Sequence, residues 1–198
     1  MSRAAFYSAV RKRPFGGALV QSQVDGMEAI LDAWNGLAIS DDRRWLAYML
    51  ATTYHETAAT MQPIRERGGT AYFTRMYDIR GERPHVARAL GNTQPGDGAL
   101  YHGRGYPQLT GRANYAKASI VVQYDLIADP DAAMRPDFAT AIMFAGMRDG
   151  WFTGKRLADY FSRAKDDPVN ARRIINGTDK AQLIAGYHRD FLAALGNG

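Results

Sequence analysis

Two glutamates ten positions apart could supply the acid and the base of a hydrolytic reaction. Glu56 lies in the run Tyr54-His55-Glu56-Thr57, near the end of an apolar segment that we expect to form a buried helix. Burial disfavours a charged carboxylate and so keeps a carboxyl protonated near neutral pH, as a general acid requires. The same glutamate could instead form a structural ion pair with an arginine, and the residues alone leave both interpretations open.

Glu66 is the second carboxylate, in the run Ile64-Arg65-Glu66-Arg67-Gly68. Two carboxyls about 6.5–9.5 Å apart are typical of an inverting glycosidase, because a water must fit beside the sugar ring. The flanking arginines also suit a solvated surface charge, and spacing alone favours that simpler interpretation. Glu82 and Asp97 lie in the same irregular region and are alternatives for the second carboxylate, although each is more simply a loop charge.

Metal and cysteine chemistry are not predicted. A metalloprotease pattern needs a second histidine four residues after His55, and that position is Ala59. The chain has no cysteine, which excludes disulfides, thiolate metal sites and a cysteine nucleophile. General acid–base hydrolysis of a glycoside needs no cofactor, and we expect none.

Glycine, aromatic and amide residues alternate between positions 101 and 115. Tyrosine faces stack on the CH groups of pyranose rings, while Gln, Thr and Asn side chains hydrogen-bond to hydroxyls. The run Gly103-Arg104-Gly105 is too short for a phosphate-binding loop. A basic, aromatic segment could also bind single-stranded nucleic acid, and composition does not separate the two.

Apolar spacing predicts a mainly α fold around one irregular middle section. A capping hydroxyl at Ser40 with two following aspartates favours a helix start there, and the helix is expected to run to about Met61 before Pro63. The middle section, from Pro63 to Gly111, is predicted to form loops, short helical pieces and a small hairpin. The three tryptophans are expected in the core, and His188 on the surface. The other helices are expected over 24–34, 113–121, 138–150 and 182–195, with a shorter one over 169–176.

Composition favours one globular catalytic domain over residues 1–198, with a helical segment, 1–40, packed on a 41–198 core. Of the 198 residues 46% are hydrophobic, and the net charge of +5 favours an anionic partner such as a nucleic acid, an acidic envelope polymer or a membrane surface. Basic residues occur early in the chain, but Pro14-Phe15-Gly16-Gly17 interrupts any signal-peptide core. No stretch approaches the roughly 18 apolar residues of a membrane span. We therefore expect folding in the cytoplasm and export only with outside help.

Four segments together resemble the family 19 glycoside hydrolases, which are chitinases and their bacteriophage endolysin relatives. The matching segments occur in order between about residues 44 and 190: His55-Glu56-Thr57, Glu66-Arg67-Gly68, Tyr101-x-Gly103-Arg104-Gly105-x-x-Gln108-Leu109-Thr110-x-x-x-Asn114-Tyr115 and Ile175-Asn176-Gly177. The resemblance implies a lysozyme-like, mainly α-helical domain whose irregular loop and short-hairpin region lines a substrate groove. The helix over 24–34 and the compact length are closer to the endolysin branch than to plant chitinases, which carry cysteines.

Carried over by position, the resemblance implies a role for each matching residue. Glu56 corresponds to the general acid, Glu66 to the general base, and Thr110 to a hydroxyl that helps to hold the attacking water. Gln108, Asn114 and Asn176 correspond to positions that line the sugar groove, which Tyr101 and Arg104 support.

The resemblance implies an endolysin that hydrolyses the β-1,4 glycan bonds of peptidoglycan, most plausibly as a muramidase. It implies that the protein is released from the host cytoplasm through a holin and acts on the cell wall. It implies no nucleic-acid partner and no stable membrane insertion. A monomer is the default expectation. A chitinase acting on N-acetylglucosamine polymer uses the same machinery. A non-catalytic module that binds carbohydrate or nucleic acid is the third alternative, but such a module would need neither Glu56 nor Glu66.

Overall fold

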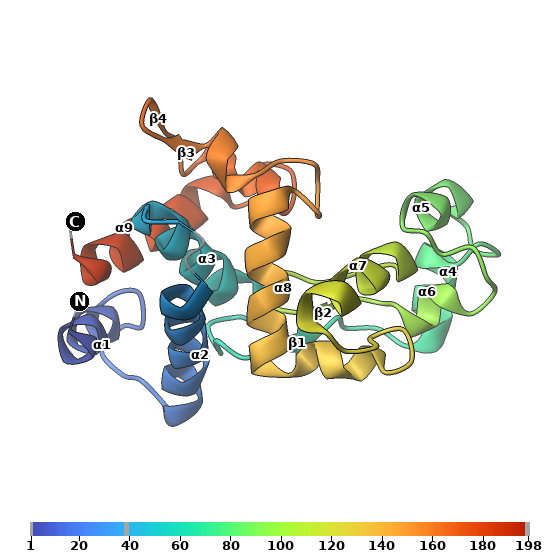
Figure 1. The fold of residues 1–198 in the computed structure, drawn as a ribbon, viewed down its shortest axis with the longest axis horizontal. Coiled ribbons are helices and arrows are strands. Elements are labelled where there is room, and N and C mark those ends of the chain that lie inside the picture. Colours follow the sequence, from blue (N-terminus) through green and yellow to red (C-terminus); the bar gives the residue numbers. More distant parts are fainter. Residues whose placement is uncertain (1, 38–39, 197–198) are drawn as a thin grey trace. The chain divides into compact units, whose positions relative to one another are not determined.

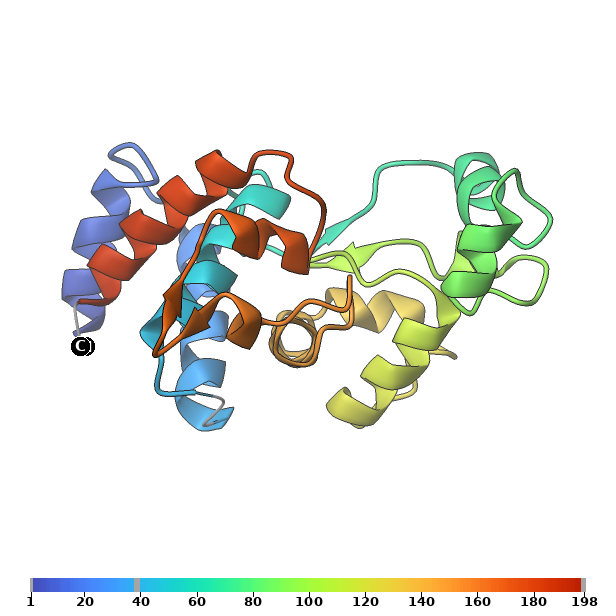
Figure 2. The same cartoon turned by 90° about the horizontal axis from the view of Figure 1, so that it is seen from above.

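The computed structural model describes residues 2–37 and 40–196, which form mainly α-helices with short 3-10 helices and two small antiparallel β-ladders (Figures 1 and 2). The predicted mainly α fold is confirmed. The chain divides into two compact units: unit 1 comprises Met1–Gln62 and Met143–Gly198, and unit 2 comprises Pro63–Ile142. The single catalytic domain expected over 1–198 remains a prediction. Within the described residues, no helix is long and apolar enough to span a membrane.

Unit 1 is organised around the contact between α3 (Arg43–Glu56) and α9 (Ala181–Leu195). Helix α1 (Arg3–Lys12) also packs against α9, and α2 (Gln21–Leu37) packs against α3 (Figure 2). Helix α3 is buried from Leu46 to Thr53, as its apolar sequence predicts. The remaining elements are the C-terminal part of α8 (Pro136–Asp149), η2 (Leu157–Asp159), β3 (Phe161–Ser162), β4 (Lys165–Asp166) and η3 (Asn170–Ile174).

The ends of α3 differ from the prediction, and local hydrogen bonds give the reason. Asp42 caps the N-terminus, with its carboxylate accepting from Arg44 N at 3.0 Å, whereas the Ser40 hydroxyl accepts from Asp42 N one turn earlier. The helix ends at Glu56 instead of about Met61. The Thr57 hydroxyl donates to Thr53 O (2.7 Å) and accepts from Met61 N (3.0 Å), which closes the last turn. Glu56 therefore lies at the C-terminal end of a rigid helix.

Unit 2 is held by a β-ladder between residues far apart in the sequence. Strand β1 (Ile64–Arg65) pairs antiparallel with β2 (Arg104–Gly105), with Ile64 opposite Gly105 and Arg65 opposite Arg104. The expected small hairpin is thus a long-range ladder. Between the two strands lie α4 (Thr70–Tyr77), α5 (Pro84–Ala89) and α6 (Asp97–Leu100); after them come α7 (Arg112–Val122), η1 (Pro130–Met134) and the start of α8.

Most predicted helices are present, and several shorter elements are not predicted. Helices α2, α7, α8 and α9 match the expected ranges, whereas the segment expected over 169–176 is the 3-10 helix η3. Helix α1 and the β3–β4 hairpin were not foreseen. Trp34, Trp45 and Trp151, which were expected in the core, are only partly buried. His188, expected on the surface, is 2% exposed because its face of α9 packs against Phe161 and Tyr48.

Candidate active site

In unit 1, Glu56 is paired with an arginine from a distant part of the chain. Arg172 Nη1 donates to Glu56 Oε1 at 2.5 Å, and the two side chains are 5% and 23% exposed, respectively. The second carboxylate oxygen, Oε2, accepts no hydrogen bond from the described residues. The pair was one of the two interpretations left open for Glu56, and it fixes one oxygen while the other stays free to reach a ligand.

Arg172 also ties the segment that follows η3 to this glutamate. Its Nε donates to Asp179 O at 3.1 Å, and its own carbonyl accepts from Asn176 N at 3.0 Å. The Asn176 side chain is exposed and accepts from Gly177 N at 2.8 Å, so the predicted sugar-binding asparagine lies on the segment that Arg172 anchors. Next to Glu56, His55 is half-buried. Desolvation lowers the pKa of His55, and the negative charge of Glu56 offsets only part of that decrease.

In unit 2, Glu66 is held at three points and is not a free surface charge. Tyr77 Oη donates to its Oε1 at 2.7 Å, and Gly103 N donates to its Oε2 at 3.0 Å. Its own backbone N donates to Gly103 O at 2.8 Å. Both carboxylate oxygens therefore accept hydrogen bonds, which fix the position and orientation of the carboxylate.

A stack of three rings holds the donors of Glu66. Phe73 lies parallel to His102 with ring centroids 4.2 Å apart, and stacks on Tyr77 at 6.4 Å. His102 Nδ1 is bonded to Ala99 O at 2.7 Å, and desolvation by burial lowers the pKa of this histidine. His102 is 7% exposed, so the stack lies inside unit 2. Desolvation, followed by the hydrogen bond to Glu66, raises the pKa of Tyr77, which keeps its hydroxyl proton available as a donor.

Tyr101 and Arg104 lie inside unit 2 and shape the segment that carries Gly103. Tyr101 is 1% and Arg104 4% exposed. Arg104 Nη1 donates to Leu100 O (3.0 Å), His102 O (3.2 Å) and the Tyr115 hydroxyl (2.9 Å). Their predicted support of a sugar site would therefore act through the backbone that they hold.

Gln108, Thr110 and Asn114 are partly exposed on the same segment. A Cβ atom at Gly103 would lie 2.6 Å from Gln108 Oε1, so the glycine leaves room for this amide beside the residue that holds Glu66. Asn114 Nδ2 donates to Thr110 O at 2.9 Å. The Thr110 hydroxyl makes no hydrogen bond to any described residue, so it is free to bind a water. Gly103 thus links Glu66 to Gln108, and Asn114 is bonded to Thr110 further along the same segment.

The alternative carboxylates have other surroundings. Asp97 is 2% exposed and forms an ion pair with Arg112 at 2.6 Å, and it also accepts from Gln94 N, so it holds the fold. Asp78 is similarly buried, and accepts from backbone N–H groups including that of Arg80. Glu82 is exposed and has no ion pair among the described residues.

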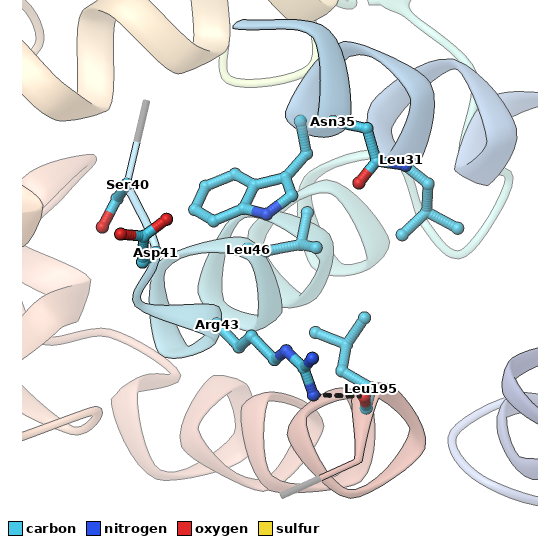
Figure 3. A pocket seen from close by; sticks show the side chains of 8 residues that line it. Leu31, Asn35, Ser40, Asp41, Arg43, Leu46 and Leu195 are labelled. Carbon is cyan, nitrogen blue, oxygen red and sulfur yellow. Dashed lines mark hydrogen bonds between the residues drawn. The ribbon is translucent and has the colours of Figure 1, made fainter. Parts of the chain in front are cut away.

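A separate pocket in unit 1 has no part in this chemistry (Figure 3). Leu31, Asn35 and Leu46 line it, and Arg43 crosses its floor to donate to Leu195 O at 3.3 Å and Gly196 O at 3.1 Å. These bonds satisfy the terminal carbonyls of α9, so the arginine is a helix C-cap. Elsewhere, no group of three or more His, Asp or Glu residues within 2–37 and 40–196 is arranged to hold a metal ion.

Comparison with known proteins identifies the fold. No family model and no curated protein sequence matches the chain. Among solved structures, chitinase C from Streptomyces griseus superposes with a TM-score of 0.61 and 21% identity over 99% of this chain and 76% of that chain. A mutant of chitinase C gives 0.59 and 20% over the same shares. A bacterial family 19 chitinase gives 0.57 and 20% over 100% of this chain and 95% of that chain.

The class defined by this likeness is the mainly α chitinase fold. More narrowly, the chain has the fold of the family 19 chitinases, which confirms the resemblance found in the sequence. None of these three neighbours is described as an endolysin.

Sequence analysis missed two residues of the site. Neither Arg172, the partner of Glu56, nor Tyr77, the donor to Glu66, was among the residues predicted for the site. A buried arginine in a 3-10 turn has no sequence pattern of its own. The spacing of Phe73 and Tyr77, four residues apart on one helix face, was the signal available for the ring stack.

Proposed function

We propose that this chain is a glycoside hydrolase that cleaves β-1,4 bonds in an N-acetylated cell-wall glycan, and that its substrate is peptidoglycan. The observation that carries the proposal is the double support of the Glu66 carboxylate, by Tyr77 Oη at 2.7 Å and Gly103 N at 3.0 Å, on a fold shared with family 19 chitinases. A glutamate that served only solubility would not require a buried ring stack and a dedicated backbone donor.

In the proposed mechanism, Glu56 protonates the glycosidic oxygen as the bond to the leaving sugar breaks. Glu66 accepts the proton of the water that attacks the anomeric carbon, and the Thr110 hydroxyl orients that water. With Glu66 as base, the configuration at the anomeric carbon inverts. Arg172 bonds Glu56 Oε1, which leaves Oε2 to carry the transferred proton.

The proposed sugar contacts come from three amide side chains. Gln108, Asn114 and Asn176 would hydrogen-bond to hydroxyl and acetamido groups of the glycan. Tyr101 and Arg104 would act indirectly, by holding the 101–105 backbone. The mechanism uses acid–base chemistry alone and no cofactor.

The biological role that we propose is that of a muramidase-type endolysin. It would be made in the host bacterial cytoplasm, released through a holin as a monomer, and would degrade the cell wall to cause lysis. The net charge of +5 supports an anionic envelope polymer as the target.

Chitin is the second candidate substrate, favoured by the three chitinase neighbours. Both polymers present β-1,4-linked N-acetylated sugars, so the acid and the base would serve either one. A non-catalytic carbohydrate-binding module is the remaining alternative.

The test is digestion of purified peptidoglycan and, in parallel, of chitin, followed by borohydride reduction and mass spectrometry of the fragments. Reduced muramic acid ends, absent with Glu56→Gln, are the expected result. The matched control is Glu28→Gln, the same change at a glutamate of unit 1 that also pairs with an arginine, Arg3, at 3.3 Å; it should retain activity.

Each other outcome leads to a different conclusion. Reduced glucosamine ends from peptidoglycan would mean a glucosaminidase, and products from chitin alone would mean a chitinase. If neither polymer were cut, the protein would be a binding module and the proposal would be wrong.

A further inference from the structure

Helices α4 and α5 of unit 2, with the turn between them, carry an unusual concentration of unpaired positive charge (Figure 1). Between residues 67 and 88 five arginines stand against two acids, Asp78 and Glu82. All five arginines are exposed, and none forms an ion pair with any described residue: Arg67, Arg75, Arg80, Arg83 and Arg88. We call these five residues the arginine cluster.

The backbone holds two members of the cluster close together. After α4 the chain folds back so that Glu82 N donates to Arg75 O at 2.9 Å, and Gly81 packs so tightly that a Cβ atom there would lie 2.3 Å from a backbone oxygen of α4. Arg75 and Arg80 consequently line one pocket, together with Glu82. The Asp78 carboxylate is buried, accepts from the Arg80 N–H and from two glycine N–H groups, and forms no ion pair with any described residue.

This arrangement favours an anionic ligand. The five arginines outnumber the two acids of this segment, and an anion bound between like charges reduces their mutual repulsion. Guanidinium groups bind carboxylates in a bidentate manner. Tyr72, 37% exposed with Arg75 lying 5.9 Å above its ring, adds an aromatic face on which a sugar ring can pack.

The cluster is continuous with the candidate active site. Arg67 is the next residue after Glu66, and Arg75 shares α4 with Tyr77, whose hydroxyl donates to Glu66. Burial and the hydrogen bond to Glu66 raise the pKa of Tyr77, and the positive charge of Arg83 partly offsets that rise. A polymer strand held by the cluster would therefore reach Glu66.

We propose that the arginine cluster binds the carboxylates carried by an acidic glycan strand, and so selects peptidoglycan over the uncharged polymer chitin. This inference rests on the proposed function, because it assigns a substrate class to the same site. The ligand chemistry is a sugar chain bearing carboxylates at intervals, such as those of the peptide stems of peptidoglycan or of lactyl groups that carry no stem. Aromatic and basic residues also suit single-stranded nucleic acid, which the test below distinguishes.

The test measures binding of the full chain to purified peptidoglycan sacculi by sedimentation, in a Glu56→Gln background so that the polymer stays intact. Arg75, Arg80 and Arg83 are replaced together by Gln. The matched control replaces Arg11, Arg163 and Arg189 of unit 1, which are also exposed and without ion pairs to described residues, so both triple variants lose three positive charges. Circular dichroism verifies that each variant is folded.

The cluster variant is expected to bind sacculi about tenfold more weakly, since each exposed charge pair contributes up to about 1 kcal/mol. The control should stay within twofold of the parent. Binding of the parent to sacculi should weaken as NaCl is raised from 50 to about 300 mM, because salt screens the charges. Binding to chitin beads should change little, either with salt or with the cluster substitutions.

Equal weakening in both triple variants would overturn the proposal, because net charge and not the cluster would then be responsible. Displacement of sacculi by a single-stranded oligonucleotide at an equal concentration of negative charges would overturn it in favour of nucleic acid. Because binding is scored without catalysis, cluster-dependent binding by a chain that hydrolyses neither polymer would support the cluster and refute the proposed function. Hydrolysis of peptidoglycan by the parent, together with unaltered binding by the cluster variant, would support the proposed function and refute the role of the cluster.

Discussion

Replacing Arg172 by Met removes the partner of Glu56 while keeping an unbranched side chain in a site that is 5% exposed. Exposed ion pairs contribute about 0.2–1 kcal/mol, whereas breaking a fully buried pair costs about 3–5 kcal/mol. Because Glu56 is 23% exposed, we expect an intermediate loss. The free energy of unfolding should fall by about 2 kcal/mol, which for a chain of this length lowers Tm by roughly 4–8 °C.

The assay is thermal unfolding at pH 7 of four proteins: the parent, Arg172→Met, Glu56→Gln and the double variant. If the loss comes from an uncompensated carboxylate, Arg172→Met should cost less than half as much when position 56 is Gln. Equal costs in both backgrounds would refute the reasoning, because the loss would then come from packing or from the bond to Asp179. Hydrolysis by Glu56→Gln, measured in parallel, separates the role of acid from that of structural partner.

Three further predictions concern other residues. Tyr77→Phe keeps the ring stack but removes one hydrogen bond from Glu66, so hydrolysis of peptidoglycan should fall about tenfold, and an unaltered rate would remove Tyr77 from the site. Asp97→Asn should lower stability by about 2 kcal/mol through its ion pair with Arg112 and keep the rate of the folded protein at 25 °C, whereas a lost rate would make Asp97 the base. His188 titrates at a pKa of about 4 in the folded state because it is desolvated, against about 6.5 unfolded. Its unfolded form therefore binds more protons between these values, and up to about 3 kcal/mol of stability should be lost as pH falls from 6.5 to 4. His188→Phe should flatten that dependence in thermal melts at pH 7 and 4.5.

The long helices were predictable because each buries one apolar face, and that face recurs in the sequence. Their ends were less predictable, since they depend on which of several polar side chains reaches the backbone. Ser40, Asp41 and Asp42 are all good capping residues, and only the contact of Asp42 with Arg44 selects the cap. The β1–β2 ladder joins residues 39 and 41 positions apart and leaves no local pattern of alternation.

The candidate site, like the fold, was predictable only in part. Glu56 and Glu66 were found through the resemblance, which their spacing alone did not establish. The partners that fix them, Arg172 and Tyr77, come from segments whose local sequence indicates nothing about a carboxylate. Sequence identified the groups with chemical capacity, and the tertiary fold supplies the hydrogen bonds that orient them.

Residues that distinguish peptidoglycan from chitin have to contact the substrate away from the bond that is cleaved. Cleavage of either polymer breaks a β-1,4 bond between N-acetylated sugars, so an acid and a base placed as Glu56 and Glu66 would not distinguish them. The polymers differ in the carboxylates that peptidoglycan carries away from the scissile oxygen, and a positively charged surface beside the proposed base would attract those groups. The arginine cluster has that charge and that position. If it selects the substrate, its loss should change which polymer is bound while Glu56 and Glu66 keep their roles, so specificity and chemistry would be separable in this fold.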